Sequence, residues 1–449
     1  MHRHKAVPAL VAVALGWLLA AGSALAQVAG EVEFSRGVGF AQGTGQAPRT
    51  LGKGLELREG DRLTTSEGAS AIIKLQDGTR MTVRPNSELV LQQYHFRESA
   101  PDNSMLMQLV RGGFRAVTGL ISKGSPNAAR IQTSTATIGI RGTDFDARLC
   151  VQECGAESSR VLEQARPNAV LASAKIVQSQ GELYAVDANA VRRRVVDGGS
   201  IYPGDVVEST AGSRGVIVFR DDSRVSIGPN TRFRIDNFVY DEQNAGEGRF
   251  LASLLRGSVR ALTGLIAKAN NRNVGFATST ATIGIRGTGF DMACPGDCTE
   301  GNLTLFTWLG SISFQQNGQT ALELLQAGQG LLVTPTGITP INSQPDVDGA
   351  RPDSVTVPPK LFAKEDVPDA KEGLFVFVRD GHIEIATATE VLHLGRGEAG
   401  FAGADGETAR PQTIPKFIDF DRLPMPTAKN PLLLSVLADN SIRPANTCK

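Results

Sequence analysis

The sequence has little of what enzyme catalysis usually needs. Histidine occurs five times in 449 residues, and aromatic residues make up only 6% of the chain. Beyond the N-terminal stretch only His95, His382 and His393 remain. None of them lies in an H-E-x-x-H pattern, and the G-x-S-x-G nucleophile motif is absent. These gaps exclude zinc-peptidase and serine-hydrolase sites of those types. We predict that the protein is not an enzyme and holds no metal or cofactor.

An excess of charge of one sign is also lacking. Lys plus Arg and Asp plus Glu both number 46, so the formal net charge is zero. A balanced chain has no global attraction for nucleic acid or for an anionic membrane. Long apolar runs are missing beyond the N-terminal region, and the run at 432–437 is far too short to span a bilayer. We therefore expect no nucleic-acid partner and no transmembrane segment in the mature chain.

The N-terminus predicts export. Arg3 and Lys5 are followed by an apolar stretch at residues 6–19, and residues 24–26 read Ala-Leu-Ala. A basic start, a short apolar region and small residues at the cleavage point are the parts of a secretory signal peptide. We expect cleavage after Ala26 and a periplasmic or otherwise exported mature protein.

Glycine, in contrast, is abundant. The 49 glycines show no collagen period, which indicates many turns and hence many short strands. Residues 71–75, 80–83 and 88–92 are short strand-like runs separated by Asp-Gly and Pro-Asn turns. We predict strand–turn–strand over 254–266 and a hairpin over 374–385. The fold class is therefore all-β, with sandwich, prism and solenoid architectures left open.

An internal repeat organises the chain. Residues 133–143 recur identically at 278–288, and the similarity extends upstream through Gly60-Asp61 and Gly204-Asp205. A shorter likeness links 392–400 with 324–330. We predict the following division: signal peptide 1–26, first β-domain 27–175, second β-domain 176–334, Pro- and Asp-rich linker 335–370, smaller C-terminal β module 371–423 and irregular tail 424–449.

The repeated Ala-Thr-Ile-Gly-Ile-Arg-Gly-Thr, at 136–143 and 281–288, resembles the signature of the FecR domain. The likeness covers about 28–149 and 180–333. It implies two tandem all-β modules that bind other proteins or envelope components. Named members of the family relay a signal from an outer-membrane receptor to a cytoplasmic sigma factor, through a cytoplasmic segment and one transmembrane helix. This sequence shows a signal peptide in place of those two parts.

The signature supplies the candidate site residues. Glycines at this spacing let a backbone turn tightly, and an Arg fixed in such a turn can bind a carboxylate with both arms. The structural hypothesis is that Arg141 and Arg286 pair with a nearby acid such as Asp146 or Asp291. The functional hypothesis is that they contact a ligand carboxylate or a partner. The signature turns comprise Gly139, Arg141, Gly142, Thr143, Gly284, Arg286, Gly287 and Thr288.

Four of the five cysteines follow the two signatures at equivalent places. Cys150 and Cys154 form one C-x-x-x-C pair, and Cys294 and Cys298 form the other. In an exported protein this pattern predicts one disulfide per module. A four-cysteine zinc site that joins the modules is the alternative. Cys448 is left over, either free or paired between chains.

We weigh three functions. The first is a non-catalytic periplasmic scaffold that contacts an envelope or outer-membrane protein, or a surface polymer. The second is a component of a cell-surface signalling system that acts through a separate membrane protein. The third is an enzyme on envelope polymer, with Asp144 and Asp146 as paired acids. Gly289 replaces the first of these acids in the second copy, which weighs against a shared catalytic pair.

Overall fold

The structure, a computed structural model, describes residues 27–124, 128–298, 302–319, 323–345 and 347–421. The described chain consists mainly of β-strands with a few short helices, which confirms the predicted all-β fold. The predicted signal peptide and the predicted tail at 424–449 lie outside the described residues. In the part that is described, no helix is long and apolar enough to cross a membrane.

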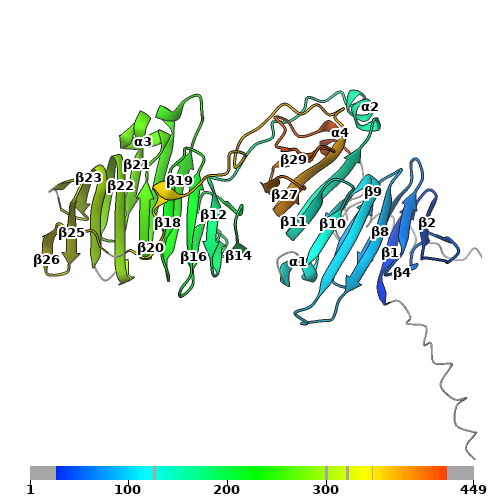
Figure 1. Cartoon of the computed structure of the whole chain (residues 1–449), viewed down its shortest axis with the longest axis horizontal. Helices are drawn as coiled ribbons and strands as arrows, with labels where there is room; N and C mark the ends of the chain where they lie inside the picture. Colours follow the sequence, from blue (N-terminus) through cyan, green and yellow to red (C-terminus); the bar gives the residue numbers. More distant parts are fainter. Residues whose placement is uncertain (1–26, 125–127, 299–301, 320–322, 346, 422–449) are drawn as a thin grey trace, which may run out of the picture.

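The strands form two 15-stranded sheets with the same topology. We call the first sheet with its loops unit 1 and the second unit 2 (Figure 1). Unit 1 contains β1 (Val28–Arg36), β2 (Gly39–Gln42), β3 (Arg49–Thr50), β4 (Glu56–Arg58), β5 (Arg62–Thr65), β6 (Ser70–Leu75), β7 (Arg80–Val83), β8 (Glu88–His95), β9 (Ser104–Val117), β10 (Ala129–Gln132), β11 (Thr137–Cys150), β27 (Gly373–Ala386), β28 (Val391–Gly395), β29 (Ala399–Ala402) and β30 (Thr408–Ala409).

Unit 2 contains β12 (Ala174–Gln180), β13 (Leu183–Val186), β14 (Arg192–Val195), β15 (Ser200–Ile201), β16 (Val206–Ser209), β17 (Arg214–Phe219), β18 (Arg224–Ile227), β19 (Arg232–Val239), β20 (Arg249–Leu262), β21 (Val274–Ala277), β22 (Ala281–Asp297), β23 (Leu303–Gln316), β24 (Glu323–Gln326), β25 (Gln329–Thr334) and β26 (Gly337–Ile341). The short helices are α1 (Leu120–Gly124), α2 (Glu153–Ser159), α3 (Leu265–Ala269), α4 (Lys416–Asp419), η1 (Ala245–Glu247), η2 (Asn271–Asn273) and η4 (Pro352–Ser354).

Each unit has two layers that share three long strands. In unit 2 the first half of β20 pairs with β19 and β21, and its second half pairs with β18 and β22. Strands β22 and β23 divide between the layers in the same way. The layers face each other across an apolar core, where the ring centroids of Phe219 in β17 and Phe250 in β20 lie 4.3 Å apart.

Each long strand bends where it passes between the layers. Gly257, Gly287 and Gly310 stand at the bends of unit 2 and have positive φ angles, as do Gly112, Gly142 and Gly381 in unit 1. The register shifts between Arg286 and Gly289, which marks a bulge. A glycine at positive φ redirects a strand there without reversing it.

The bends correct two predictions made from sequence. The segment 254–266 is not strand–turn–strand: it belongs to one bent strand, β20, followed by the start of helix α3. The segment 374–385 is not a hairpin, because β27 runs through the Asp-Gly pair as a single strand. Both segments contain the glycine that a turn would need, and it serves here as a bend.

The C-terminal segment completes unit 1. Strand β27 pairs with β11 along its length, from Cys150 opposite Gly373 to Thr137 opposite Ala386, as β23 pairs with β22 in unit 2. The chain therefore leaves unit 1 after β11, builds unit 2, and returns through a second connection (Figure 1). The described part of the predicted C-terminal module, residues 371–421, is no separate module, because its strands β27–β30 belong to the first sheet and helix α4 follows them. Without them β11 would present a long unpaired edge.

The predicted linker at 335–370 is also more structured than expected. Its first part is β26, which pairs with β25 and ends the second layer of unit 2. Its later part contains the single turn η4, and Glu365 forms an isolated bridge to Pro411 of unit 1. The first part of the segment is therefore an edge strand of unit 2, and its last part is attached to unit 1.

The bend of unit 2 gives a matched pair of glycine substitutions. A Cβ at Gly310 would lie 2.4 Å from the carbonyl oxygen of Gly287, whereas a Cβ at Gly287 would meet nothing within 4 Å. Because both φ angles are positive, alanine costs about 1–2 kcal/mol at either site. At Gly310 the clash adds a further cost of about 1–3 kcal/mol. Urea denaturation of the two variants is expected to show the larger loss of stability for Gly310→Ala. Equal losses would contradict the close approach.

Candidate functional site

The signature residues lie at the bend of β11 and, in unit 2, of β22. Thr143 fixes the bend: its N–H donates to Thr118 Oγ1 at 2.8 Å, and its Oγ1 donates to the His382 carbonyl at 3.0 Å. In unit 2 the N–H of Thr288 likewise donates to Thr263 Oγ1 at 3.0 Å. These signature positions therefore hold the crossing between the two layers.

The two signature arginines differ in their surroundings. Arg141 is half-buried and its NH2 lies 3.8 Å from Glu384 Oε2. Burial lowers the pKa of Arg141, while the charges of Glu384 and Asp197 raise it and that of Arg194 lowers it. Arg286 is exposed, and the described residues place no acid within ion-pair distance of it. Ser313 stands where unit 1 has Glu384, because each is opposite the first glycine of its own signature, Gly284 or Gly139.

The suggested pairing of these arginines with Asp146 and Asp291 is wrong. Asp291 accepts from Arg260 Nε at 2.7 Å and from Trp308 Nε1 at 3.2 Å. Asp146 accepts from Arg379 Nε at 2.7 Å. The reason is the bend, since it lies between each arginine and its proposed partner and places them on different layers.

Asp144 and Asp146 do not form a catalytic pair either. Asp144 pairs with Arg115, with 3.0 Å between its Oδ2 and Arg115 NH2. Asp146 is fully buried beneath Arg379 and Arg84. Burial raises the pKa of Asp146, and the two arginines oppose that rise. Each acid serves as the counter-ion of an arginine on a neighbouring strand.

A contact between the units contains three fully buried charged side chains. We call it the junction and define it by Lys175 and Tyr202 of unit 2 together with His382, His393, Arg396, Glu398 and Arg410 of unit 1. Lys175 Nζ donates to Glu398 Oε2 at 3.0 Å, and Arg410 Nε donates to the same oxygen at 2.8 Å. The side chains of all three are fully buried. Lys175 and Arg410 also donate to the His393 carbonyl.

The junction charges depend on one another. Burial alone would raise the pKa of Glu398, but Lys175 and Arg410 hold it below its usual value. Burial lowers the pKa of Lys175 to about 8 in spite of Glu398. Lys175 and Glu398 are therefore ionised at pH 7, and with Arg410 they form a buried network that ties β12 to the residue before β29 and the residue after β30. Such a network is costly to break, because Lys175 and Arg410 share Glu398 as their counter-ion, and its loss would leave two buried cations with carbonyl partners only.

Two histidines and a tyrosine complete the junction. His393 Nδ1 lies 3.4 Å from His382 Nε2. Burial lowers the pKa of His393 to about 4 and that of His382 well below its usual range, so both rings are neutral at pH 7. Tyr202 Oη accepts from the Arg396 N–H at 2.9 Å, and the Arg396 guanidinium lies 4.6 Å from the Tyr202 ring centroid.

A cavity of about 260 Å³ opens beside the junction. Its walls come from β12, the turn at Asp197 and Gly198, the connection at 358–361, and β28. In the described residues no group of three or more His, Cys, Asp or Glu side chains could hold a metal ion. The mixed apolar and charged lining is suited to binding a small polar molecule or a peptide side chain.

The two units match one protein family separately. The model of the FecR protein family matches residues 61–163 and residues 205–307. Each match begins at the Gly-Asp step that precedes β5 or β16, and includes the bent signature strand. The chain carries two tandem FecR domains. The matches end before β27 and within β23, so the closing strands of both FecR domains lie mostly outside the matched residues.

Other comparisons give less. No curated protein matches the chain. Two crystal structures of a candidate anti-sigma factor from Parabacteroides distasonis, at 1.65 and 2.50 Å resolution, align with 13% sequence identity and a TM-score of 0.25. The alignment covers 30% of this chain and 59% of theirs, so the chain spans less than two thirds of those proteins.

Each FecR domain has its predicted disulfide. Cys150 bonds to Cys154 and Cys294 bonds to Cys298, which excludes the zinc alternative for these four thiols. Cys448 lies outside the described residues.

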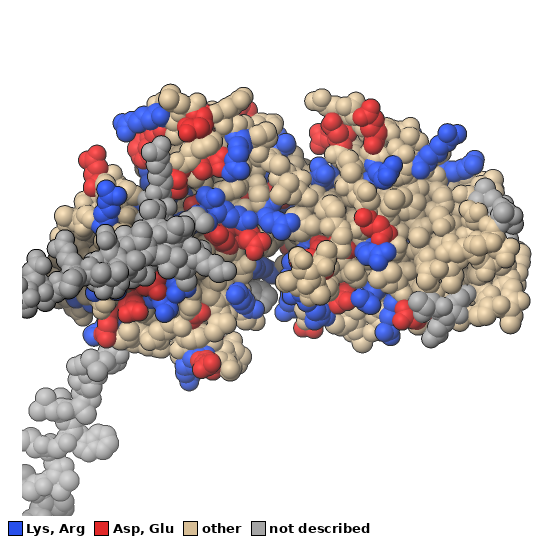
Figure 2. All heavy atoms as spheres, turned by 180° about the vertical axis from the view of Figure 1, so that it is seen from behind, with Lys and Arg blue, Asp and Glu red and all other residues tan. Residues whose placement is uncertain are grey.

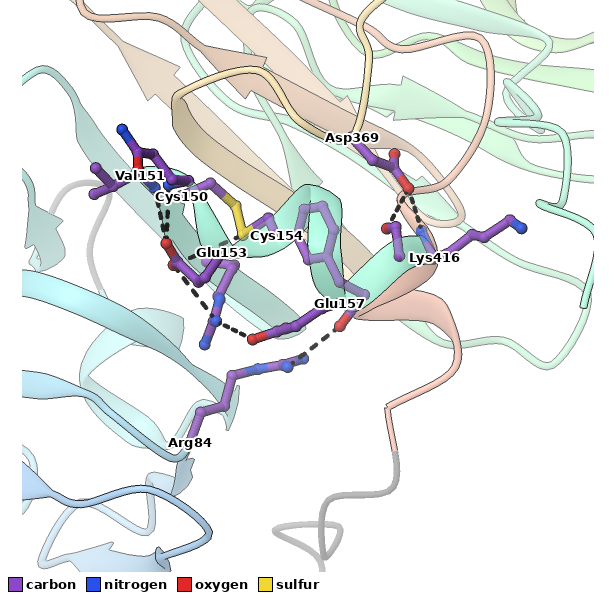
Figure 3. Close-up of a disulfide and its surroundings, with 12 residues drawn as sticks. Arg84, Cys150, Val151, Glu153, Cys154, Glu157, Asp369 and Lys416 are labelled. Atoms are coloured by element: carbon purple, nitrogen blue, oxygen red, sulfur yellow. Dashed lines mark hydrogen bonds and ion pairs between the residues drawn. A yellow bond between two sulfur atoms is a disulfide. The ribbon is translucent and has the colours of Figure 1, made fainter. Parts of the chain in front are cut away.

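The first disulfide holds helix α2 against unit 1. It joins the end of β11 to helix α2 (Figure 3). Asp369, from the second connection, accepts from Ser158 Oγ of α2 and from the Lys416 N–H of α4 at 3.1 Å. Helices α2 and α4 are thereby held together over the outer face of β27 and β29, where Phe375 and Phe417 pack edge to face.

The junction residues were missed by sequence reasoning. Lys175 and Glu398 are 223 positions apart, and neither lies in the repeated signature. One sequence signal pointed to them: the likeness of 392–400 to 324–330, which shows that the C-terminal segment copies the closing strands of unit 2. Because 324–330 closes unit 2, this likeness also predicts that Glu398 lies in the closing part of unit 1.

Proposed function

We propose that this protein is an exported, non-catalytic binding protein in which two FecR domains form one scaffold that contacts an envelope partner. The buried Lys175–Glu398–Arg410 network carries the proposal, because it fixes the two domains to each other as a domain core would. Two chain connections across the same gap restrict their relative motion further (Figure 1). A pair held in this way offers a partner a preformed surface at low entropic cost.

Membership of the FecR family favours a second candidate. In that case the same scaffold is a component of a cell-surface signalling system, and a separate membrane protein passes the signal inward. The candidates differ in the partner that they require: a receptor or an anti-sigma protein for signalling, and surface polymer or adhesin machinery for a scaffold.

Crosslinking in the producing cell tests the proposal. We expect the chain in the exported fraction with an N-terminus at Gln27, and one envelope component recovered with it in saturable amounts. Recovery is expected to fall for Glu398→Ala, which loosens the junction, and to persist for Val207→Ala, which destabilises the core of unit 2 and leaves the junction residues in place. A chain confined to the cytoplasm, or turnover of envelope polymer by the purified protein, would contradict the proposal.

A further inference from the structure

The two FecR domains are equivalent strand for strand, but within the described residues only one of them has its closing end covered. In unit 1 the start of unit 2 packs against the closing strands β28 and β29. The turn at Gly198 lies against the His393 ring. In unit 2 no described element of another unit packs on the corresponding strands β24 and β25, which lie with β26 at the left end of Figure 1. We call the surface formed by Arg286, Leu309, Leu324 and Gln329 the free end.

The free end has the composition of a contact surface. Leu324 takes the position of His393, because these residues stand opposite Ser313 and Glu384 in equivalent registers. Its side chain is 48% exposed, and that of Leu309, beside the bend of β23, is 50% exposed. Figure 2 shows few charged side chains at this end of the molecule, on the right of that view. An exposed apolar patch rimmed by polar residues is typical of an interaction site, and we interpret Leu309 and Leu324 with the exposed Arg286 in this way.

The covered end shows which chemistry an occupant needs. Asp197, in the turn that precedes Gly198, lines the cavity beside His393, and its negative charge raises the pKa of Arg141, the signature arginine of unit 1, as that of Glu384 does. Lys175 enters from the same side to pair with Glu398. In unit 2 the signature arginine is exposed and no longer has an acid on the neighbouring strand, since Ser313 replaces Glu384. An occupant must therefore bring the acid itself.

A second copy of this chain does not meet that need. Its exposed end would be the start of unit 1, where Lys53 stands in place of Asp197 and Glu31 in place of Lys175. The equivalence rests on backbone contacts: the Gly54 N–H donates to the Val32 carbonyl as Gly198 does to Ile176. Stacked in the same way, Lys53 would face Arg286, and Glu31 would face the uncharged Gln329. Like charges placed opposite each other disfavour that contact.

We propose that the free end binds a different protein, one that presents a β-turn with an acidic residue to Arg286 and seats an apolar contact on Leu324. This inference names a partner class for the binding protein proposed above and rests on that function. It adds that the free end is the contact surface, that the partner contributes a negative charge, and that a second copy of this chain is not the partner.

A graft onto the chain itself tests the geometry. Glu31→Lys and Lys53→Asp give the start of unit 1 the charges of the start of unit 2, and both positions are exposed, so folding is not at risk. Gln329→Glu supplies the counterpart of Glu398. The triple variant is expected to form open head-to-tail oligomers whose mass rises with concentration in analytical ultracentrifugation, while the native chain stays monomeric to about 0.1 mM. Arg286→Glu added to the graft should return it to a monomer, and Arg286→Lys should not.

Three outcomes would overturn the inference. The first is a folded graft, checked by circular dichroism, that stays monomeric over the same range. The second is a native chain that self-associates, since the occupant would then be a second copy. The third is a graft whose oligomers are unaffected by Arg286→Glu. Because the experiment uses purified chain only, its failure is distinct from failure of the envelope function, which the crosslinking in cells decides.

Discussion

Replacing Glu398 by alanine is expected to lower the free energy of unfolding by about 3–5 kcal/mol, because it leaves the buried Lys175 and Arg410 without their shared counter-ion. Urea denaturation followed by tryptophan fluorescence and by circular dichroism would measure the loss. The unfolding curves from the two probes should also differ, because Trp308 belongs to unit 2 whereas circular dichroism reports on both units. Unit 2 would then unfold independently of unit 1.

The internal repeat supplies the control for this prediction. Gln329 occupies the place of Glu398 in unit 2 and is exposed, so Gln329→Ala is expected to change stability by no more than about 0.5 kcal/mol. Replacing all three junction charges with apolar residues of similar size, as Lys175→Met, Glu398→Leu and Arg410→Met, should recover much of the loss. Equal effects of Glu398→Ala and Gln329→Ala would show that the network does not hold the units together.

The second large effect is loss of stability in mild acid. In the folded protein, burial lowers the pKa of His393 to about 4 and that of His382 well below its usual range. In the unfolded chain both histidines titrate near ~6.5. Between these values the unfolded chain binds protons that the folded protein does not, so stability is complete above about pH 6.5 and falls as the pH drops toward 4. At roughly 1.4 kcal/mol per pKa unit, His393 alone contributes about 3 kcal/mol.

The charges around His393 also favour a lowered pKa, so they do not reverse the predicted loss of stability in acid. Lys175, Arg141 and Arg410 all oppose protonation of His393, and Glu398 favours it more weakly. The matched variant takes its residues from unit 2, where Ser311 and Leu324 stand at the positions of His382 and His393. Thermal unfolding between pH 7 and pH 4 is expected to show a clearly shallower decline for the double variant His382→Ser, His393→Leu. An unchanged slope would mean that the carboxylates alone cause the acid sensitivity.

The strands could be predicted well where alternation and turn residues agree. Residues 71–75, 80–83 and 88–92 lie within β6, β7 and β8, because each has apolar residues facing one core and a turn at each end. The bends could not be predicted, since an Asp-Gly or Arg-Gly step within a strand has the same composition as a hairpin turn. Only the partner strand decides between the two. At Gly381 the partner is β11, which bends at Gly142 and continues with β27 into the other layer.

By itself, the sequence determined the duplication, the all-β modules and the FecR resemblance, and it favoured two disulfides over a zinc site, because these depend on local residues or on similarity between segments. The tertiary structure alone decided which strands close unit 1, how the units are joined and where Arg141 and Arg286 differ. Backbone hydrogen bonding is the same for every strand, so the edge of β11 accepts β27 across more than two hundred intervening residues without any local signal. The buried charges of Lys175 and Glu398 become partners only once that pairing has brought the two chain segments together.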